Sequence, residues 1–265
     1  KKALIHLTTL LITALSYSQA DTLQVKLDSI IKEADLLFNY EEIAWNSTDL
    51  LMSEGKLIEN YGGYVIYHSN DTIQASFIDK KQQKRIAKYS FTTSNLQTPF
   101  NSNFDFIELS KNEKTLLETK IKIANQFSDK KYEVSFPQGF NPNLVLIKGE
   151  NEYKLYILMG TSESGIIPFG NDYLFQSDLD GNIVKWKKFH SRIIPAQTEM
   201  PNGEKVILAV HSHLKSTPYI TATDVCTFRL YGRLYGMKEF MVLSTATGKY
   251  FKYNIDTNKI EITEP

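Results

Sequence analysis

The sequence predicts an α+β fold, in which a mixed sheet with flanking helices follows a smaller region made of helices and a β-hairpin. Apolar residues recur at helical spacing in residues 27–38, whereas beyond residue 64 they alternate with polar residues in short runs separated by turns. The chain has 265 residues, 42% of them apolar, with no internal repeat and no low-complexity tract. This composition is typical of a globular protein that buries a proper core.

The first twenty residues have the pattern of a secretory signal peptide. Two lysines precede an apolar run over residues 3–15, and small residues stand at Ser18 and Ala20. The run is too short to span a bilayer comfortably, and no later segment approaches that length. We therefore expect a soluble, exported protein, periplasmic or extracellular, whose mature chain begins near Asp21, with no transmembrane segment.

Charge and cysteine content exclude two classes of protein. Lys and Arg together number 30, as do Asp and Glu, and loss of the first two lysines would leave a net charge of −2. A balance of this kind argues against nucleic-acid binding. Cys226 is the single cysteine, so no intrachain disulfide can form, and we interpret it as a small buried apolar residue.

The predicted N-terminal region covers residues 21–107. Helices are expected over 27–38 and 41–52, the second ending near Gly55. A Ser-Asn-Asp turn between the alternating runs 64–67 and 73–78 predicts a β-hairpin, and a further strand is expected over 86–91. Residues 93–103 are rich in Ser, Thr, Asn and Pro and provide the best boundary.

The predicted C-terminal domain covers residues 108–265. Ser110 and Glu113 have the spacing of a capping box, which predicts a helix over 110–127. Alternating strands and turns follow, then a helix over 222–235 and a final hairpin over 240–262. The strands are expected over 143–148, 153–159, 173–177, 183–189 and 205–211.

The best candidate for chemistry lies where the last of these strands ends. His211 and His213 are two residues apart, so on a strand their side chains point to the same face. Asp224 follows eleven residues after His213, at the start of the helix 222–235. A strand end and a helix start can bring two nitrogens and a carboxylate together, which with one water would complete a tetrahedral Zn²⁺ site. Zinc lowers the pKa of such a water and polarises a substrate carbonyl.

These residues, with Thr221, resemble the His-x-His-x7-Ser-x2-Asp motif of the JAMM (MPN+) metalloproteases. The resemblance extends over residues 110–262 at most and is strongest over 206–251. It implies a mixed α/β fold, cleavage of peptide or isopeptide bonds with zinc, and His211, His213 and Asp224 as the zinc ligands. It also implies that Thr221 stands where the family's serine donates a hydrogen bond to the developing oxyanion.

Two glutamates are candidates for the general base. Glu152 precedes the strand 153–159, which leads into Gly160, and this order is similar to the family's arrangement. Glu163, in the following loop, is the alternative. A plainer interpretation also stands, in which Thr221 only caps the helix and Asp224 complements its dipole. His190, at the end of the strand 183–189, is interpreted as a satisfied surface or core histidine, with a contact to a metal ligand or to the substrate as the less favoured alternative.

The sequence therefore predicts an exported zinc-dependent hydrolase of amide, peptide or isopeptide bonds. Its substrate would be a peptide or protein outside the cytoplasm, and the N-terminal region would shape access or recruit a partner. The alternative is a non-catalytic exported binding or scaffold protein with a degenerate JAMM-like fold. The two differ in whether a carboxylate lies close enough to the metal-bound water to take its proton.

Overall fold

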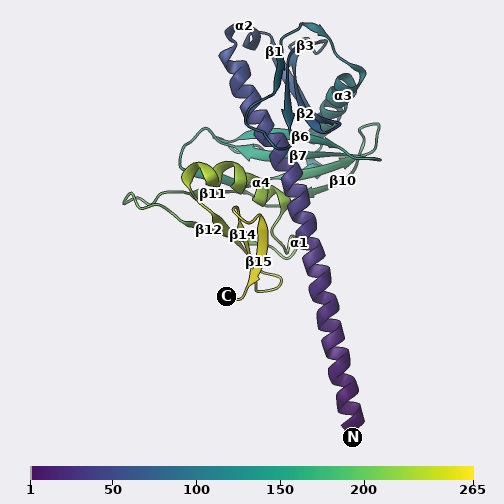
Figure 1. Cartoon of the computed structure of the whole chain (residues 1–265), viewed down its shortest axis with the longest axis vertical. Coiled ribbons are helices and arrows are strands. Elements are labelled where there is room, and N and C mark those ends of the chain that lie inside the picture. Colours follow the sequence, from purple (N-terminus) through teal and green to yellow (C-terminus); the bar gives the residue numbers. More distant parts are fainter. Residues whose placement is uncertain (1) are drawn as a thin grey trace.

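One long helix runs along the whole molecule. In the computed structural model, which describes the backbone of residues 2–265 and side chains from residue 22 onward, α1 spans Lys2–Ser53 and a short α2 spans Gly55–Ile58. The two helices expected over 27–38 and 41–52 are thus one, because neither Gly nor Pro interrupts the stretch between them. The predicted signal peptide lies outside the residues whose side chains are described. α1 passes the three layers of the molecule in turn (Figure 1).

The first layer is an antiparallel sheet with helix α3 beside it (Figure 1). The predicted hairpin and the strand after it are confirmed as β1, β2 and β3, and two short strands complete the sheet. α3 spans Lys111–Asn125 and begins at the expected capping box, in which Ser110 and Glu113 satisfy each other's backbone N–H groups. The five strands are β1 Tyr61–Ser69, β2 Thr72–Asp79, β3 Lys84–Thr92, β4 Asn101–Asn103 and β5 Ile107–Glu108.

The second layer is an antiparallel sheet in the strand order β10-β9-β7-β6. Short 3₁₀ turns at Gln126–Ser128 and Lys130–Tyr132 connect α3 to it. A two-stranded ribbon, absent from the sequence-based expectation, lies beside this sheet and consists of β8 Ile166–Gly170 and β11 Ile193–Gln197. The strands of the main sheet are β6 Asn141–Lys148, β7 Tyr153–Gly160, β9 Tyr173–Ser177 and β10 Ile183–Lys188.

The third layer contains the only parallel strand pair among residues 2–265. β12 (Leu208–His213) pairs in parallel with β13 (Glu239–Ser244), and α4 (Ala222–Tyr231) with a 3₁₀ turn (Gly232–Tyr235) forms the crossover between them. The predicted final hairpin is confirmed as β13 and β14 (Tyr250–Asn254), which pair in antiparallel, and β15 (Lys259–Thr263) adds a further antiparallel strand beside β14.

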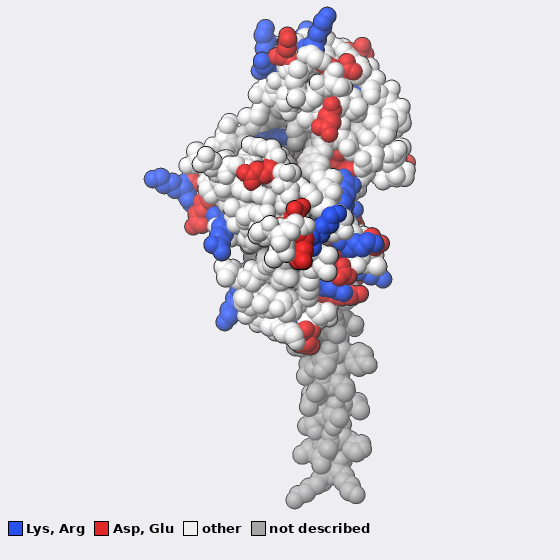
Figure 2. Space-filling model, turned by 90° about the vertical axis from the view of Figure 1, so that its left-hand side faces the viewer, with Lys and Arg blue, Asp and Glu red and all other residues white. Residues whose placement is uncertain are grey.

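The main core joins these layers and fixes α4 in place. α4 is buried on almost all sides, between α1, the ribbon strand β8 and the C-terminal sheet. Phe228, Phe240 and Tyr253, all fully buried, form an aromatic cluster beneath it. The fold is therefore α+β with mixed sheets, as predicted. Within the described part of the chain, no helix has the length and apolar character needed to cross a membrane. Figure 2 shows acidic and basic side chains interspersed over one face.

Candidate metal centre

Strand β12 presents two histidines to the interior. Along this strand buried and exposed residues alternate, so that His211 and His213 point inward while Val210 and Ser212 face solvent. The strand begins at residue 208 rather than 205, because the backbone N–H of Val206 bonds to Thr198 in the preceding loop. The two histidines therefore lie within the strand, where pairing with β13 holds their backbone rigidly.

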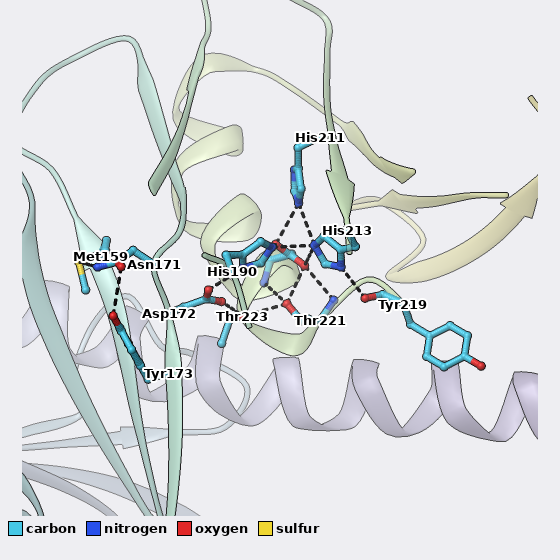
Figure 3. A network of polar contacts seen from close by, with 11 residues as sticks. Met159, Asn171, Asp172, Tyr173, His190, His211, His213, Tyr219, Thr221 and Thr223 are labelled. Atoms are coloured by element: carbon cyan, nitrogen blue, oxygen red, sulfur yellow. Dashed lines mark hydrogen bonds and ion pairs between the residues drawn. The ribbon is translucent and has the colours of Figure 1, made fainter. Parts of the chain in front are cut away.

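A third histidine and one aspartate complete the cluster. His190 follows β10, and Asp224 lies in the first turn of α4. One ligand atom from each of the four residues lies within 4.8 Å of all the others, and all four residues are buried. Asp224 and His213 are only 1% and 2% exposed. Figure 3 shows His190, His211 and His213 pointing toward a common centre. This group can therefore hold a metal ion.

The Nε2 atoms of the three histidines face one another. The Nε2 of His213 is 2.6 Å from that of His190 and 3.2 Å from that of His211. Oδ1 of Asp224 is 3.3 Å from the Nε2 of both His190 and His211. Oδ2 of Asp224 is 3.3 Å from the Nε2 of His213. Three ring nitrogens and a carboxylate thus enclose one small volume.

The opposite ring nitrogens of two histidines are already engaged. Nδ1 of His213 bonds to the backbone oxygen of Tyr219 at 2.7 Å, and Nδ1 of His190 bonds to Oδ1 of Asp172 at 2.5 Å (Figure 3). A carbonyl or carboxylate oxygen only accepts, so both Nδ1 atoms carry the proton. In the neutral imidazoles both Nε2 atoms are then acceptors, and two acceptors in contact require a proton or a cation between them.

Asp224 leaves one oxygen for the centre. Its Oδ2 accepts hydrogen bonds from the backbone N–H of Thr221 at 2.8 Å and from the Thr221 hydroxyl at 2.6 Å. Its Oδ1 is buried and has no hydrogen-bond partner among the described residues. A buried carboxylate oxygen without a donor is costly, and a metal ion would satisfy it.

His190 and Asp224 shift each other's pKa values. Burial lowers the pKa of His190, but Asp172 and Asp224 outweigh this effect and raise it to about 9. Burial likewise raises the pKa of Asp224, yet His190 and His213 hold it well below its usual range. Without a metal, a proton on His190 is therefore the charge that balances the carboxylates.

The sequence-predicted residues divide into two groups. The structure brings His211, His213 and Asp224 together, in the grouping that the spacing predicted. Thr221 is beside them, and its hydroxyl serves in a capping box with Asp224, as in the plainer interpretation. It also contacts the hydroxyl of Thr223 at 2.8 Å, and Thr223 in turn donates to Asp172.

Neither predicted base lies in the cluster. Glu152 accepts a hydrogen bond from Gln176. Gln176 lies four residues beyond Asp172 along the chain into β9, so about 13 Å of strand, at about 3.3 Å per residue, separates it from the residue that holds His190. Glu163 is exposed in the loop between β7 and β8, where its backbone N–H bonds to the Thr161 hydroxyl. The proximity expected of Glu152 or Glu163 is thus not found.

Sequence reasoning missed His190 and Asp172. His190 is buried and hydrogen-bonded, as expected of a core histidine, and it also belongs to the cluster. Each comes from a loop outside the motif, at positions 190 and 172, so no local spacing connects them to His211. The weak available signal was a histidine at the end of a strand, next to the aromatic residue Phe189.

Comparison with protein-family models, curated proteins and solved structures finds no match to this chain. The resemblance to the JAMM motif therefore stays a prediction from residues 206–251, and the geometry of the cluster carries the functional argument.

Proposed function

We propose that this protein binds Zn²⁺ through His190, His211, His213 and Asp224 in a closed, four-ligand site that ties the C-terminal part of the fold together. The observation that carries this proposal is the convergence of three ring nitrogens with a buried carboxylate oxygen that has no hydrogen bond. The site would link β12, α4 and the segment after β10.

The donor set and its spacing suit zinc. Imidazole nitrogen and carboxylate oxygen bind Zn²⁺ at about 2.0–2.2 Å, so tetrahedral ligands lie about 3.3 Å apart. The contacts of His211 with His213 and Asp224, at 3.2 and 3.3 Å, already have this length. The contact between His190 and His213, at 2.6 Å, would lengthen slightly.

Closure of the site argues for a structural role. Catalytic zinc sites keep one position for water, whereas structural sites have four protein ligands. His190 takes the fourth position, and both predicted bases lie elsewhere. A cavity of about 100 Å³ lies on the Tyr219 side of the cluster, but none of the four ligands lines it. The non-catalytic alternative is therefore the function that the geometry supports best.

A zinc-dependent amide hydrolase is the second candidate, and the spacing His-x-His-x7-Thr-x2-Asp favours it. It would require a water as a fifth ligand, or His190 to leave the metal, together with a base from a residue not yet placed at the site. Export likewise stays a prediction from residues 1–20.

Metal analysis of the purified protein tests the binding site. We expect one zinc per chain, and loss of that zinc in His213→Ala. Ser212→Ala is the matched control, since Ser212 lies on the same strand and faces solvent. Equal zinc in the wild type and His213→Ala would overturn the proposal.

Replacement by Co²⁺ distinguishes the closed site from the open one. A metal-bound water ionises near neutral pH, so the visible spectrum of an open site changes between pH 6 and 9 and on adding a hydroxamate. We expect a tetrahedral Co²⁺ spectrum that neither treatment changes. A spectrum that changes both with pH and on adding the hydroxamate would favour the hydrolase instead.

A further inference from the structure

A second site lies far from the histidines, beside the upper part of α1. A cavity of about 450 Å³ lies there between α1, β1 and β6. Figure 2 shows the molecule hollowed between its upper part and its middle. The cavity is lined by Glu41, Ala44, Trp45, Thr48, Asp49, Tyr61, Tyr64 and Asn143. Its size lies in the range of pockets that bind small molecules.

Glu41 is the unusual member of this lining. Its side chain is buried, with 2% of the residue exposed, yet it borders the cavity. Its Oε2 accepts a hydrogen bond from Nδ2 of Asn143 at 2.9 Å, and its Oε1 receives none from any described residue. Burial raises the pKa of this carboxyl to about 7, against the opposing effects of Asn143 and Lys120. Lys120 is the positive charge that acts on it, but the Nζ of Lys120 donates to the backbone oxygen of Tyr64 at 3.4 Å, and no cation among the described residues forms an ion pair with Glu41.

Aromatic rings form much of the remaining wall. Trp45, Tyr61 and Tyr64 are half-buried, and each lines the cavity. The ring of Tyr64 already has a cation over it, with Nζ of Lys120 4.4 Å from the ring centroid. Faces of indole and phenol rings attract cations through the ring quadrupole, and most strongly where water is excluded.

The charge of the lining has one sign. Asp49 adds a second, exposed carboxylate, and no Lys, Arg or His is among the lining residues. Aromatic rings with polar groups also suit a sugar, but a sugar supplies no charge to a buried carboxylate. The combination of rings and carboxylates therefore favours a positively charged ligand.

We propose that this cavity binds a small organic cation of the ammonium class, with its charge beside Glu41 and its alkyl groups against Trp45, Tyr61 and Tyr64. The site is independent of the metal centre. Affinity would come from the carboxylate and from the rings together, so that a neutral molecule of the same shape binds much more weakly.

Choline and 3,3-dimethylbutan-1-ol, its uncharged analogue of the same shape, test the charge requirement. Trp186→Phe leaves Trp45 as the only tryptophan, so fluorescence reports on the cavity directly. We expect a saturable change with choline, at least tenfold weaker binding of the alcohol, and no response to glucose. Calorimetry on the wild type checks the same three ligands without relying on fluorescence.

Glu41→Gln keeps the shape of the side chain and removes its charge. We expect at least tenfold weaker choline binding in this variant and unchanged binding in Glu54→Gln, a control just beyond the end of α1 whose side chain is exposed. Equal affinity for choline and the alcohol, binding of glucose alone, or no choline binding by calorimetry would each overturn the proposal in the wild-type protein. Unchanged choline affinity in a folded Glu41→Gln variant would do the same.

Discussion

Replacing Asp172 with asparagine should change how zinc affinity depends on pH. The new amide oxygen can still accept from Nδ1 of His190, so the ring stays in place, but the charge that helps to raise the pKa of His190 to about 9 is lost. In the wild type at pH 7, about one His190 in a hundred is unprotonated, because pH 7 lies two units below that pKa. A proton thus lowers the apparent zinc affinity about a hundredfold at pH 7, and this loss disappears toward pH 9.

The Asp172→Asn variant should follow a different profile. The pKa of its His190 should be lower than in the wild type, because only Asp224 then opposes the effect of burial, so less proton competition remains at pH 7. Loss of an outer-sphere carboxylate also weakens zinc binding about 10- to 100-fold, or about 1.4–2.7 kcal/mol. At pH 8.5 the proton still lowers the wild-type affinity about fourfold, so we expect the variant to bind zinc about 3- to 25-fold more weakly there, and expect the two affinities to approach each other at pH 7.

Competition with a fluorescent zinc chelator at pH 7.0, 7.75 and 8.5 measures these affinities. Asp178→Asn is the control, since Asp178 is a carboxylate in the exposed turn before β10 and accepts from Asn182. The reasoning is refuted if the ratio of wild-type to variant affinity is the same at every pH.

Three further outcomes follow from the same contacts. Chelation should lower the melting temperature by about 5–10 °C relative to protein with zinc at a hundredfold excess over its Kd, which corresponds to about 2.7 kcal/mol. His213→Ala should show no such change in calorimetry. Thr221→Ala removes the helix cap and a donor to Asp224, so urea unfolding of the metal-free protein should show a loss of about 1 kcal/mol. A stability unchanged from wild type would contradict this role. For Glu113, burial raises the pKa, but hydrogen bonds from Ser76 and Ser110 outweigh it and lower the value to about 2. The ionised side chain therefore contributes about 3 kcal/mol to the free energy of unfolding above pH 4.5, and this contribution is lost as the pH falls toward 2. In urea titrations the wild type should be more stable than Glu113→Gln above pH 4.5 and should lose that difference toward pH 2. A difference in unfolding free energy between the two proteins that does not change with pH would contradict this role of the Glu113 charge.

Local patterns were sufficient for much of the fold. The capping box at Ser110 and the alternation in β1, β2 and β3 are properties of a few adjacent residues, so the sequence predicted these elements closely. The strand with the two histidines was shifted, because Val206 and Ile207 are apolar and predict strand, yet they lie in a loop held by Thr198. The ribbon of β8 and β11 pairs segments that are far apart in sequence, and no turn signal connects them.

The site was predictable only as far as sequence spacing determines position. His211 and His213 share a face because they lie two apart on a strand, and Asp224 reaches them because a parallel crossover places the start of α4 above β12. Asp172 and His190 arrive on the loops that precede and follow the β9–β10 hairpin, and only the packing of that hairpin's sheet against α4 determines their place. Pairings of this kind depend on tertiary structure, which no window of adjacent residues contains.

His190, which the motif does not include, determines which kind of zinc site the spacing of His211, His213 and Asp224 would form. A His-x-His pair with a distant Asp supplies three ligands in either a catalytic or a structural zinc site, so the motif cannot distinguish them. The fourth position distinguishes them, and in the proposed site His190 takes it, 21 residues before the motif begins, with Asp172 fixing its ring. The same short spacing can therefore stand in a protein that cleaves amide bonds and in one that uses zinc to hold a sheet, a helix and a loop together. Co²⁺ spectra of the wild type and of His190→Ala would separate these cases, because only removal of the fourth ligand should admit a water that ionises near pH 7.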